Sequence, residues 1–139
     1  MQLILIVIAV LLLLVFVLWR TKKPLLPESL IVVSFDDTTI STADHRGESQ
    51  AIRWEKLTRV GIRTTDAGPL APDVFWGLHA GDTTPAVEFP GGATGEQELL
   101  KAMEVRLSGF RDDQVTRAMG STANDYFVVW ERPSIAGEA

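Results

Sequence analysis

The sequence predicts an N-terminal transmembrane helix followed by a small α+β domain, built as a bent antiparallel sheet or partly open barrel with a C-terminal amphipathic helix. Two observations lead to this prediction. In residues 3–19, 15 of the 17 side chains are Leu, Ile, Val or Phe, and none is charged. After them, a series of segments with strand-like patterns precedes a helix-like pattern, an order typical of α+β domains.

The apolar segment is long enough to act as a membrane anchor. Its side chains favour insertion by roughly 4 to 9 kcal/mol, and at ~1.5 Å per residue it covers about 25 Å of the ~30 Å hydrocarbon core. A basic region before it and a small-residue cleavage site after it are both missing, so we expect an anchor rather than a cleaved signal peptide. The expected anchor residues are Leu3, Leu18, Trp19, Arg20, Lys22 and Lys23.

The charges predict where the domain lies. Arg20, Lys22 and Lys23 follow the apolar segment directly, and such positive flanks normally stay in the cytoplasm. We therefore expect a single-pass protein of the inner (cytoplasmic) membrane with its C-terminal domain in the cytoplasm. Without these three cations, 10 of the 13 basic side chains remain against 18 acidic ones, a net charge of −8. This charge opposes binding to nucleic acid and to anionic lipid, and it favours a basic protein partner.

The chain divides into four predicted parts: a transmembrane helix (1–20), a linker (21–29), a soluble domain (30–132) and a disordered tail (133–139). About 110 residues beyond the anchor and linker are enough for one core and too few for two. Cysteine is absent, which excludes disulfides and thiolate chemistry.

The domain should open with strands. Residues 57–65 and 73–80 alternate apolar and polar side chains, as strands with one buried face do. Pro85 cannot donate to a ladder and so indicates the start of a strand or a sheet edge. The expected strand ranges are 30–35, 38–42, 50–54, 57–65, 73–80 and 85–89.

An amphipathic helix should follow. Thr94 and Gln97 have the spacing of a capping box, and Gly109 is a C-terminal stop. The predicted apolar face consists of Leu99, Leu100, Met103 and Leu107.

A shorter helix and a last strand should close the domain. Asp112 or Asp113 is the expected cap of a helix that runs to Met119 and ends at Gly120. Residues 126–130 have the composition of a strand.

Several motifs resemble those of a group of small, uncharacterised bacterial membrane-anchored proteins. They are Trp54-Glu55-x-Leu57, Ile62-x-Thr64-Thr65-Asp66-x-Gly68-Pro69, Asp73-x-Phe75-Trp76, Gly109-Phe110 and Ala118-Met119-Gly120-Ser121. The order of hairpins, bend and C-terminal helix is similar to that of pleckstrin-homology-like domains. The resemblance implies a binding scaffold without catalytic residues. The first turn, Phe35-Asp36-Asp37-Thr38, is acidic where a phosphoinositide site would need Lys and Arg.

The sequence offers no pattern that predicts catalysis, a cofactor or a metal. His45 and His79 lie in or beside predicted turns without ligand spacing, so we interpret both as exposed turn histidines. The carboxylate pairs 36–37 and 112–113 are adjacent residues that should diverge, and the second pair is better explained as a helix cap. We expect no catalytic, cofactor-binding or metal-binding residues, although dispersed carboxylates that converge in space are kept as an enzyme alternative.

The loop at residues 66–73 is the candidate protein-binding site. A proline-stiffened loop with one central apolar residue suits recognition because little entropy is lost on docking, and the alternative is an ordinary connection between strands. The alternative for Trp54, Trp76 and Trp130 is an aromatic binding platform, but large aromatic side chains at strand positions usually lie in the core, so we interpret Trp54 and Trp130 as core residues. The candidate protein-binding residues are Asp66, Leu70, Asp73 and Trp76.

The expected function is that of a non-enzymatic, membrane-anchored binding module. It would contact the bilayer through residues 3–19 and a protein partner at the cytoplasmic face, and an immunity protein against a toxin is one specific form. The alternative is a lipid or small-ligand sensor of the pleckstrin-homology-like kind, and the second alternative is the enzyme. No cofactor and no nucleic acid are expected.

Overall fold

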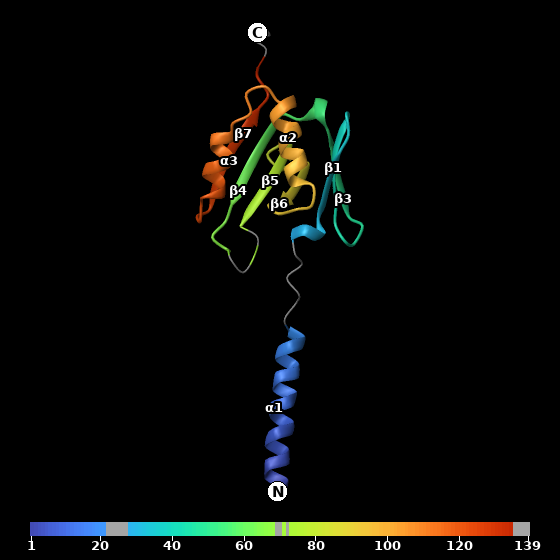
Figure 1. Cartoon of the computed structure of the whole chain (residues 1–139), viewed down its shortest axis with the longest axis vertical. Helices are drawn as coiled ribbons and strands as arrows, with labels where there is room; N and C mark the ends of the chain where they lie inside the picture. The colour runs from blue at the N-terminus through green and yellow to red at the C-terminus, as the bar shows by residue number, and fades with distance from the viewer. Residues whose placement is uncertain (22–27, 69–70, 72, 135–139) are drawn as a thin grey trace.

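The computed structural model in Figure 1 describes residues 1–21, 28–68, 71 and 73–134, without the side chains of residues 18–21. Helix α1 (Gln2–Thr21) stands apart from a domain that contains two antiparallel sheets and two further helices. The α+β class is therefore confirmed.

The first sheet has the order β1-β2-β3. A short 3-10 helix, η1 (Glu28–Leu30), leads into β1 (Val32–Phe35), which pairs with β2 (Thr39–Ala43), and β2 pairs with β3 (Ser49–Arg53). The β1–β2 turn is closed by Asp36, whose Oδ1 accepts the backbone N–H groups of Thr38 and Thr39 at 2.8 Å each. Such Asx turns explain why aspartate occurs where the chain reverses.

The second sheet has the order β6-β5-β4-β7 and is also antiparallel. A 3-10 turn, η2 (Trp54–Lys56), separates it from the first sheet. Its strands are β4 (Arg59–Thr64), β5 (Val74–His79), β6 (Val87–Pro90) and β7 (Asp125–Glu131). The predicted strands are thus present, with ends that differ by one or two residues.

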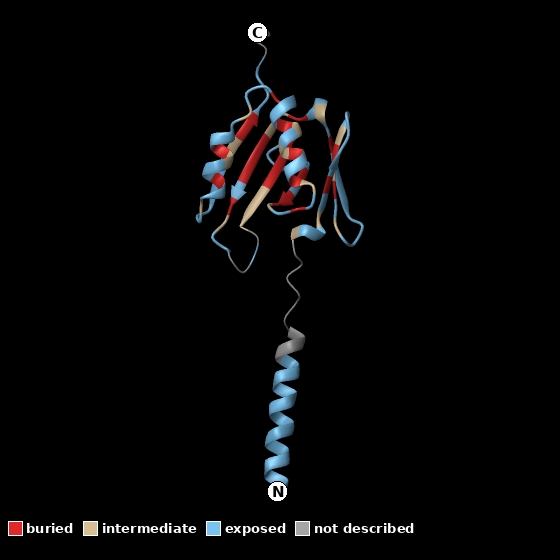
Figure 2. Ribbon diagram, viewed as in Figure 1, coloured by how far each residue is buried: buried red, intermediate tan, exposed pale blue. Residues whose placement is uncertain are grey.

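The two helices of the domain, α2 and α3, cover the buried face of the sheets. In α2 (Glu96–Arg106), Leu99 and Met103 are buried as predicted, and α3 (Asp112–Met119) packs on β7 and β4. Figure 2 shows the buried residues gathered in the strands and on the inner sides of both helices. The largest fully buried side chains include Trp76, Phe89, Ile40, Leu57, Ile62 and Leu78.

The predicted N-terminal helix caps are wrong, whereas Gly120 is the C-terminal cap of α3, as predicted. Thr94 does not cap α2, because its hydroxyl donates to the Ser29 carbonyl at 2.6 Å and its backbone pairs with β1. The cap position is Gly95, in the left-handed conformation at φ 90°. Helix α3 begins after Arg111, and the Asp113 carboxylate accepts hydrogen bonds from Gln114 and Arg111 instead of capping the helix.

The predicted single bent sheet or partly open barrel is replaced by two separate sheets, and neither is closed among the described residues. They meet at β3 and β6, where the backbone N–H of Glu88 donates to the side chain of Gln50 at 2.9 Å. A side-chain amide occupies this donor, so the ladder does not continue from one sheet to the other.

The described residues do not support the predicted membrane span. Among them, no helix has both the length and the apolarity that crossing a membrane requires. The expected anchor side chains of Leu18, Trp19, Arg20, Lys22 and Lys23 lie outside the described part, as do most of the linker and of the tail. The span at residues 1–20 stays a prediction.

Candidate functional site

The predicted protein-binding residues do not form one surface. Asp66 is exposed and Asp73 is half-buried, and both lie in the β4–β5 connection, whereas Leu70 lies outside the described residues. Trp76 is 0% exposed, opposite Ile62 in the register of β4 and β5. Its indole Nε1 donates to Glu96 at 3.1 Å. Its predicted place on a recognition surface is therefore corrected, because this position of β5 faces the core.

The exposed part of the loop borders a hollow of about 270 Å³. The hollow is lined by Thr65, Asp66, Gly68, Asp73 and Thr122. Figure 1 shows the loop at the same end of the domain as η1, where the chain enters from α1. The loop thus lies on the anchor side of the domain if α1 is an anchor.

His79 is a buried strand residue, and its interpretation as an exposed turn histidine is wrong. It is the last residue of β5 and is 5% exposed. One ring nitrogen lies 3.0 Å from the Asp82 carbonyl and the other 3.3 Å from the Tyr126 hydroxyl. Tyr126 reaches it across Gly61, where any Cβ would collide with the phenol ring. The histidine therefore ties β7 to β5.

The carboxylate pairs take structural roles. Hydrogen bonds from the backbone of Thr38 and Thr39 lower the pKa of Asp36. A hydrogen bond from the Gln114 amide lowers the pKa of Asp113. Among the residues that the structure describes, no group of three His, Asp or Glu side chains is placed to hold a metal ion.

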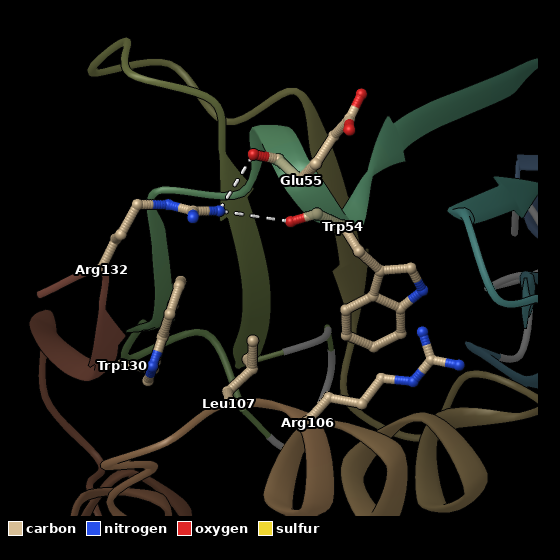
Figure 3. A pocket seen from close by; sticks show the side chains of 6 residues that line it. All are labelled: Trp54, Glu55, Arg106, Leu107, Trp130 and Arg132. Carbon is tan, nitrogen blue, oxygen red and sulfur yellow. Dashed lines mark hydrogen bonds between the residues drawn. The ribbon is translucent and has the colours of Figure 1, made fainter.

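A pocket lined by two tryptophans is the arrangement best suited to binding. This tryptophan pocket has a volume of about 430 Å³ and is shown in Figure 3. It forms where η2, the C-terminal end of α2 and the end of β7 meet. Its lining residues are Trp54, Glu55, Arg106, Leu107, Trp130 and Arg132.

One wall of the tryptophan pocket is fixed by Arg132. Its Nε and Nη2 donate to the Leu57 carbonyl at 2.9 and 2.7 Å, and Nη2 also donates to the Glu55 carbonyl at 3.0 Å. The guanidinium therefore holds the carbonyl groups at the end of η2, which the short helix leaves unpaired. Trp130, in the same wall, is 6% exposed and donates to the Ser108 carbonyl at 2.9 Å.

The opposite wall is built from Trp54 and Arg106. The Trp54 indole donates to the Asp36 carbonyl at 2.9 Å, and Phe35 meets its ring edge-on. The Arg106 guanidinium carbon lies 4.6 Å from the centre of the Trp54 ring, a cation–π geometry. Arg106 also pairs with the Asp37 carboxylate at 2.9 Å. Both indoles are thus held rigidly, with their N–H groups satisfied.

Sequence reasoning placed both tryptophans in the core and missed the two arginines. Trp130 is indeed buried, but Trp54 is only half-buried and faces the pocket. Arg106 is the last residue of α2, Arg132 follows the end of β7, and the two belong to no common motif. The only signal in the sequence was the pair of tryptophans itself.

Two other hollows are less suited to a partner. The hollow between the β2–β3 hairpin and β6, about 500 Å³, is lined by Asp44, Glu48 and Glu88 without an aromatic side chain. The hollow beside His79, about 250 Å³, has Arg59 and Glu131 on its wall, paired with each other at 2.9 Å.

Comparisons of the chain with protein-family models, with curated proteins and with solved structures find no match. The resemblance to pleckstrin-homology-like membrane proteins stays a prediction.

Proposed function

We propose that this protein is a non-enzymatic, membrane-anchored binding module that presents the tryptophan pocket to a protein partner at the cytoplasmic face of the inner membrane. The observation that carries the proposal is the position of the pocket. η2, which lines it, lies at the end of the domain opposite η1, where the chain enters from α1. A domain tethered through η1 would therefore present the pocket away from its anchor.

The proposed anchor is supported by the exposure of α1. Its large apolar side chains from Leu3 to Val17 are 48 to 77% exposed. Leaving so many apolar groups in water is unfavourable at roughly 25 cal/mol per Å². A bilayer would remove this cost, and the sequence supplies an apolar stretch of suitable length at residues 3–19.

The composition of the tryptophan pocket supports a protein partner. Tryptophan and arginine are enriched among the residues that dominate binding energy at protein interfaces. Here the side chains are already ordered by intramolecular hydrogen bonds, so less conformational entropy is lost on binding. An immunity protein that captures a toxin at the membrane is one specific form of this proposal.

The two alternatives have weaker support. A pleckstrin-homology-like lipid sensor would need a cluster of cations at the first turn, and there the turn itself carries Asp36 and Asp37, which interact with Arg106. The enzyme alternative needs carboxylates that converge in space, and in the hollow lined by Asp44, Glu48 and Glu88 the Asp44 carboxylate already accepts the backbone N–H groups of Arg46 and Glu48.

Photocrosslinking of the full chain in native membranes tests the proposal. A benzophenone amino acid replaces Glu55 on the rim of the tryptophan pocket, with matched exposed positions at Glu48 and Asp66. We expect a discrete protein adduct from position 55 alone. An adduct from position 66 alone would move the interface to the predicted loop. Release of the full chain from membranes by alkaline carbonate would contradict the anchor.

A further inference from the structure

We propose that the tryptophan pocket recognises a partner segment that presents a carboxylate next to an apolar side chain. This inference rests on the proposed function and names the chemistry of its partner. It also reverses the expectation of a basic partner, which follows from the net charge of the whole domain but not from the charges of this site.

The charges that line the tryptophan pocket favour an anion. Two of its residues, Arg106 and Arg132, are cationic, and only Glu55 is anionic. Figure 3 shows the Glu55 carboxylate directed away from the indoles, and it pairs with Arg53 at 3.4 Å. The lining of the pocket thus carries a net charge of +1, from two cations and one anion, and the carboxylate that pairs with Arg106, Asp37, is not part of the lining. At short range, such local charges outweigh distant ones because salt and water screen the latter.

Arg106 is the group placed to bind the carboxylate. Stacking on Trp54 fixes the orientation of the Arg106 guanidinium group. A guanidinium group can donate two parallel hydrogen bonds to one carboxylate. Its present partner, Asp37, has a side chain that is 99% exposed. Exposed ion pairs of this kind contribute little. Arg106 Nη1 also donates to the Asp37 backbone carbonyl at 3.1 Å, so an incoming carboxylate replaces only the Asp37 side chain at Nη2. The displaced carboxylate returns to water, and no buried charge is left unpaired.

Arg132 has a different role. Its hydrogen bonds to the Leu57 and Glu55 carbonyls make it part of the wall, so it adds positive potential but is not free to reorient. Among the ion pairs of the described residues it has no carboxylate partner. Its charge is therefore not neutralised by an ion pair within this part of the chain.

The apolar half of the site is the floor between the two indoles. Leu107 is 7% exposed and lies in this floor beside Trp130 and Trp54. A volume of about 430 Å³ accommodates one large apolar side chain together with its neighbour. Aromatic and aliphatic anchors in such preformed hollows give the largest contributions to interfaces.

Peptide selection on the full chain tests the proposed partner chemistry. A random heptapeptide phage library is panned against the full chain in detergent micelles, and the enriched peptides are synthesised with a fluorescent label. We expect Asp or Glu adjacent to an aromatic or aliphatic residue to be enriched. Enrichment of Lys and Arg, or of no sequence above a plate without protein, would overturn the inference.

Two variants and a matched control for each locate the binding of the selected peptide. Arg106→Gln should weaken it about tenfold, a loss of about 1.4 kcal/mol. Arg63→Gln is the matched control, because Arg63 also lies over an aromatic ring, at 4.4 Å from the Phe75 centroid, and also pairs with a carboxylate. It should change the affinity less than twofold. Asp37→Asn should strengthen binding about twofold or more, because the competing carboxylate is removed, whereas Glu48→Gln, with the same change in net charge, should not.

The outcomes separate this inference from the proposed function. If position 55 crosslinks to a partner but the Arg106→Gln and Arg63→Gln proteins bind the selected peptide equally, Arg106 does not bind the carboxylate. This inference then fails while the proposed function stands. If position 55 gives no adduct while the peptide results hold, the pocket binds the proposed chemistry and the proposed function fails.

Discussion

Gly95 shows how one residue sets the start of a helix. It has a φ of 90°, and a Cβ at this position would lie well inside contact distance of the Val33 carbonyl oxygen. A left-handed backbone costs a residue with a side chain about 1 to 2 kcal/mol, and the collision with a strand backbone adds to this cost. We therefore expect Gly95→Ala to lower the free energy of unfolding by about 3 kcal/mol or more, measured by urea denaturation of the full chain.

Gly109→Ala is the control for this prediction. Gly109 has a φ of 85°, but nothing lies within 4 Å of the position that a Cβ would occupy. Only the backbone cost should remain, about 1 kcal/mol. Equal losses in the two variants would mean that β1 moves away from Gly95 without resistance.

We expect Asp36 to make the stability of the fold depend on pH. Backbone hydrogen bonds lower its pKa in the folded state, so the ionised form is favoured by folding. Its contribution to stability is present above the pKa of the unfolded chain, about 3.9, and is lost as the pH falls through the folded-state value. The stability difference between wild type and Asp36→Asn should therefore be largest at neutral pH and should shrink below about pH 4.

Thermal melts of both proteins between pH 7 and pH 2.5 measure this difference. A gap that stays constant across the range would show that the carboxylate charge does not hold the β1–β2 turn.

At the scale of elements, the apolar pattern of the sequence predicted which side of a helix is buried, but the capping motif did not predict where the helix begins. The predicted apolar face of the helix was Leu99, Leu100, Met103 and Leu107. Leu99, Met103 and the cap residue Leu107 are buried, and Leu100 is half-buried. The capping box failed because its threonine is used elsewhere: Thr94 bonds to Ser29, which is distant in sequence. Short-range motifs cannot reveal such competition, since it depends on the tertiary approach of η1 to α2.

The crossing of Tyr126 over β4 is a second feature that the sequence could not disclose. Gly61 faces Gly77 in the register of β4 and β5, and the missing side chains leave room for the phenol to reach His79. The sequence shows a glycine in each strand but not that the register aligns them. The interpretation of His79 as a turn residue failed for this reason.

Glu104 on α2 lies near the like charge of Asp112 on α3. Partial desolvation and the nearby Asp112 carboxylate raise the pKa of the exposed Glu104 side chain, so its ionised form is disfavoured in the folded protein. We expect Glu104→Gln to raise the melting temperature at pH 7. The gain should disappear as the pH falls and Glu104 itself becomes protonated in wild type.

Glu98→Gln is the matched control on the same helix and should act in the opposite direction. Glu98 lies in the first turn of α2, where a negative charge favours the helix dipole. If both substitutions shift the melting temperature in the same direction, net charge rather than position explains the effect.

At the scale of the whole molecule, the candidate site was the least predictable feature. Trp54, Arg106 and Trp130 are brought together by η2, α2 and β7, three elements that are far apart in the sequence. The sequence instead indicated the loop at residues 66–73, because a sequence pattern can identify only residues that are close together in the chain. The net charge of the domain is an average over its whole surface, so it does not show that the lining of the tryptophan pocket holds two cations and one anion.

The last prediction concerns the orientation of the whole chain. If the cytoplasmic flank consists of Arg20, Lys22 and Lys23, a reporter that is active only in the cytoplasm should function when fused after Ala139, and protease added to intact spheroplasts should spare the domain. Replacing all three cations with Gln should produce inverted molecules, whose domains the protease digests, because the retained positive charge is then lost. The control replaces Arg46, Arg53 and Lys56, cations beyond the flank, and should leave the orientation unchanged. Periplasmic activity of the unmodified chain would reverse the topology and remove the tryptophan pocket from any cytoplasmic partner.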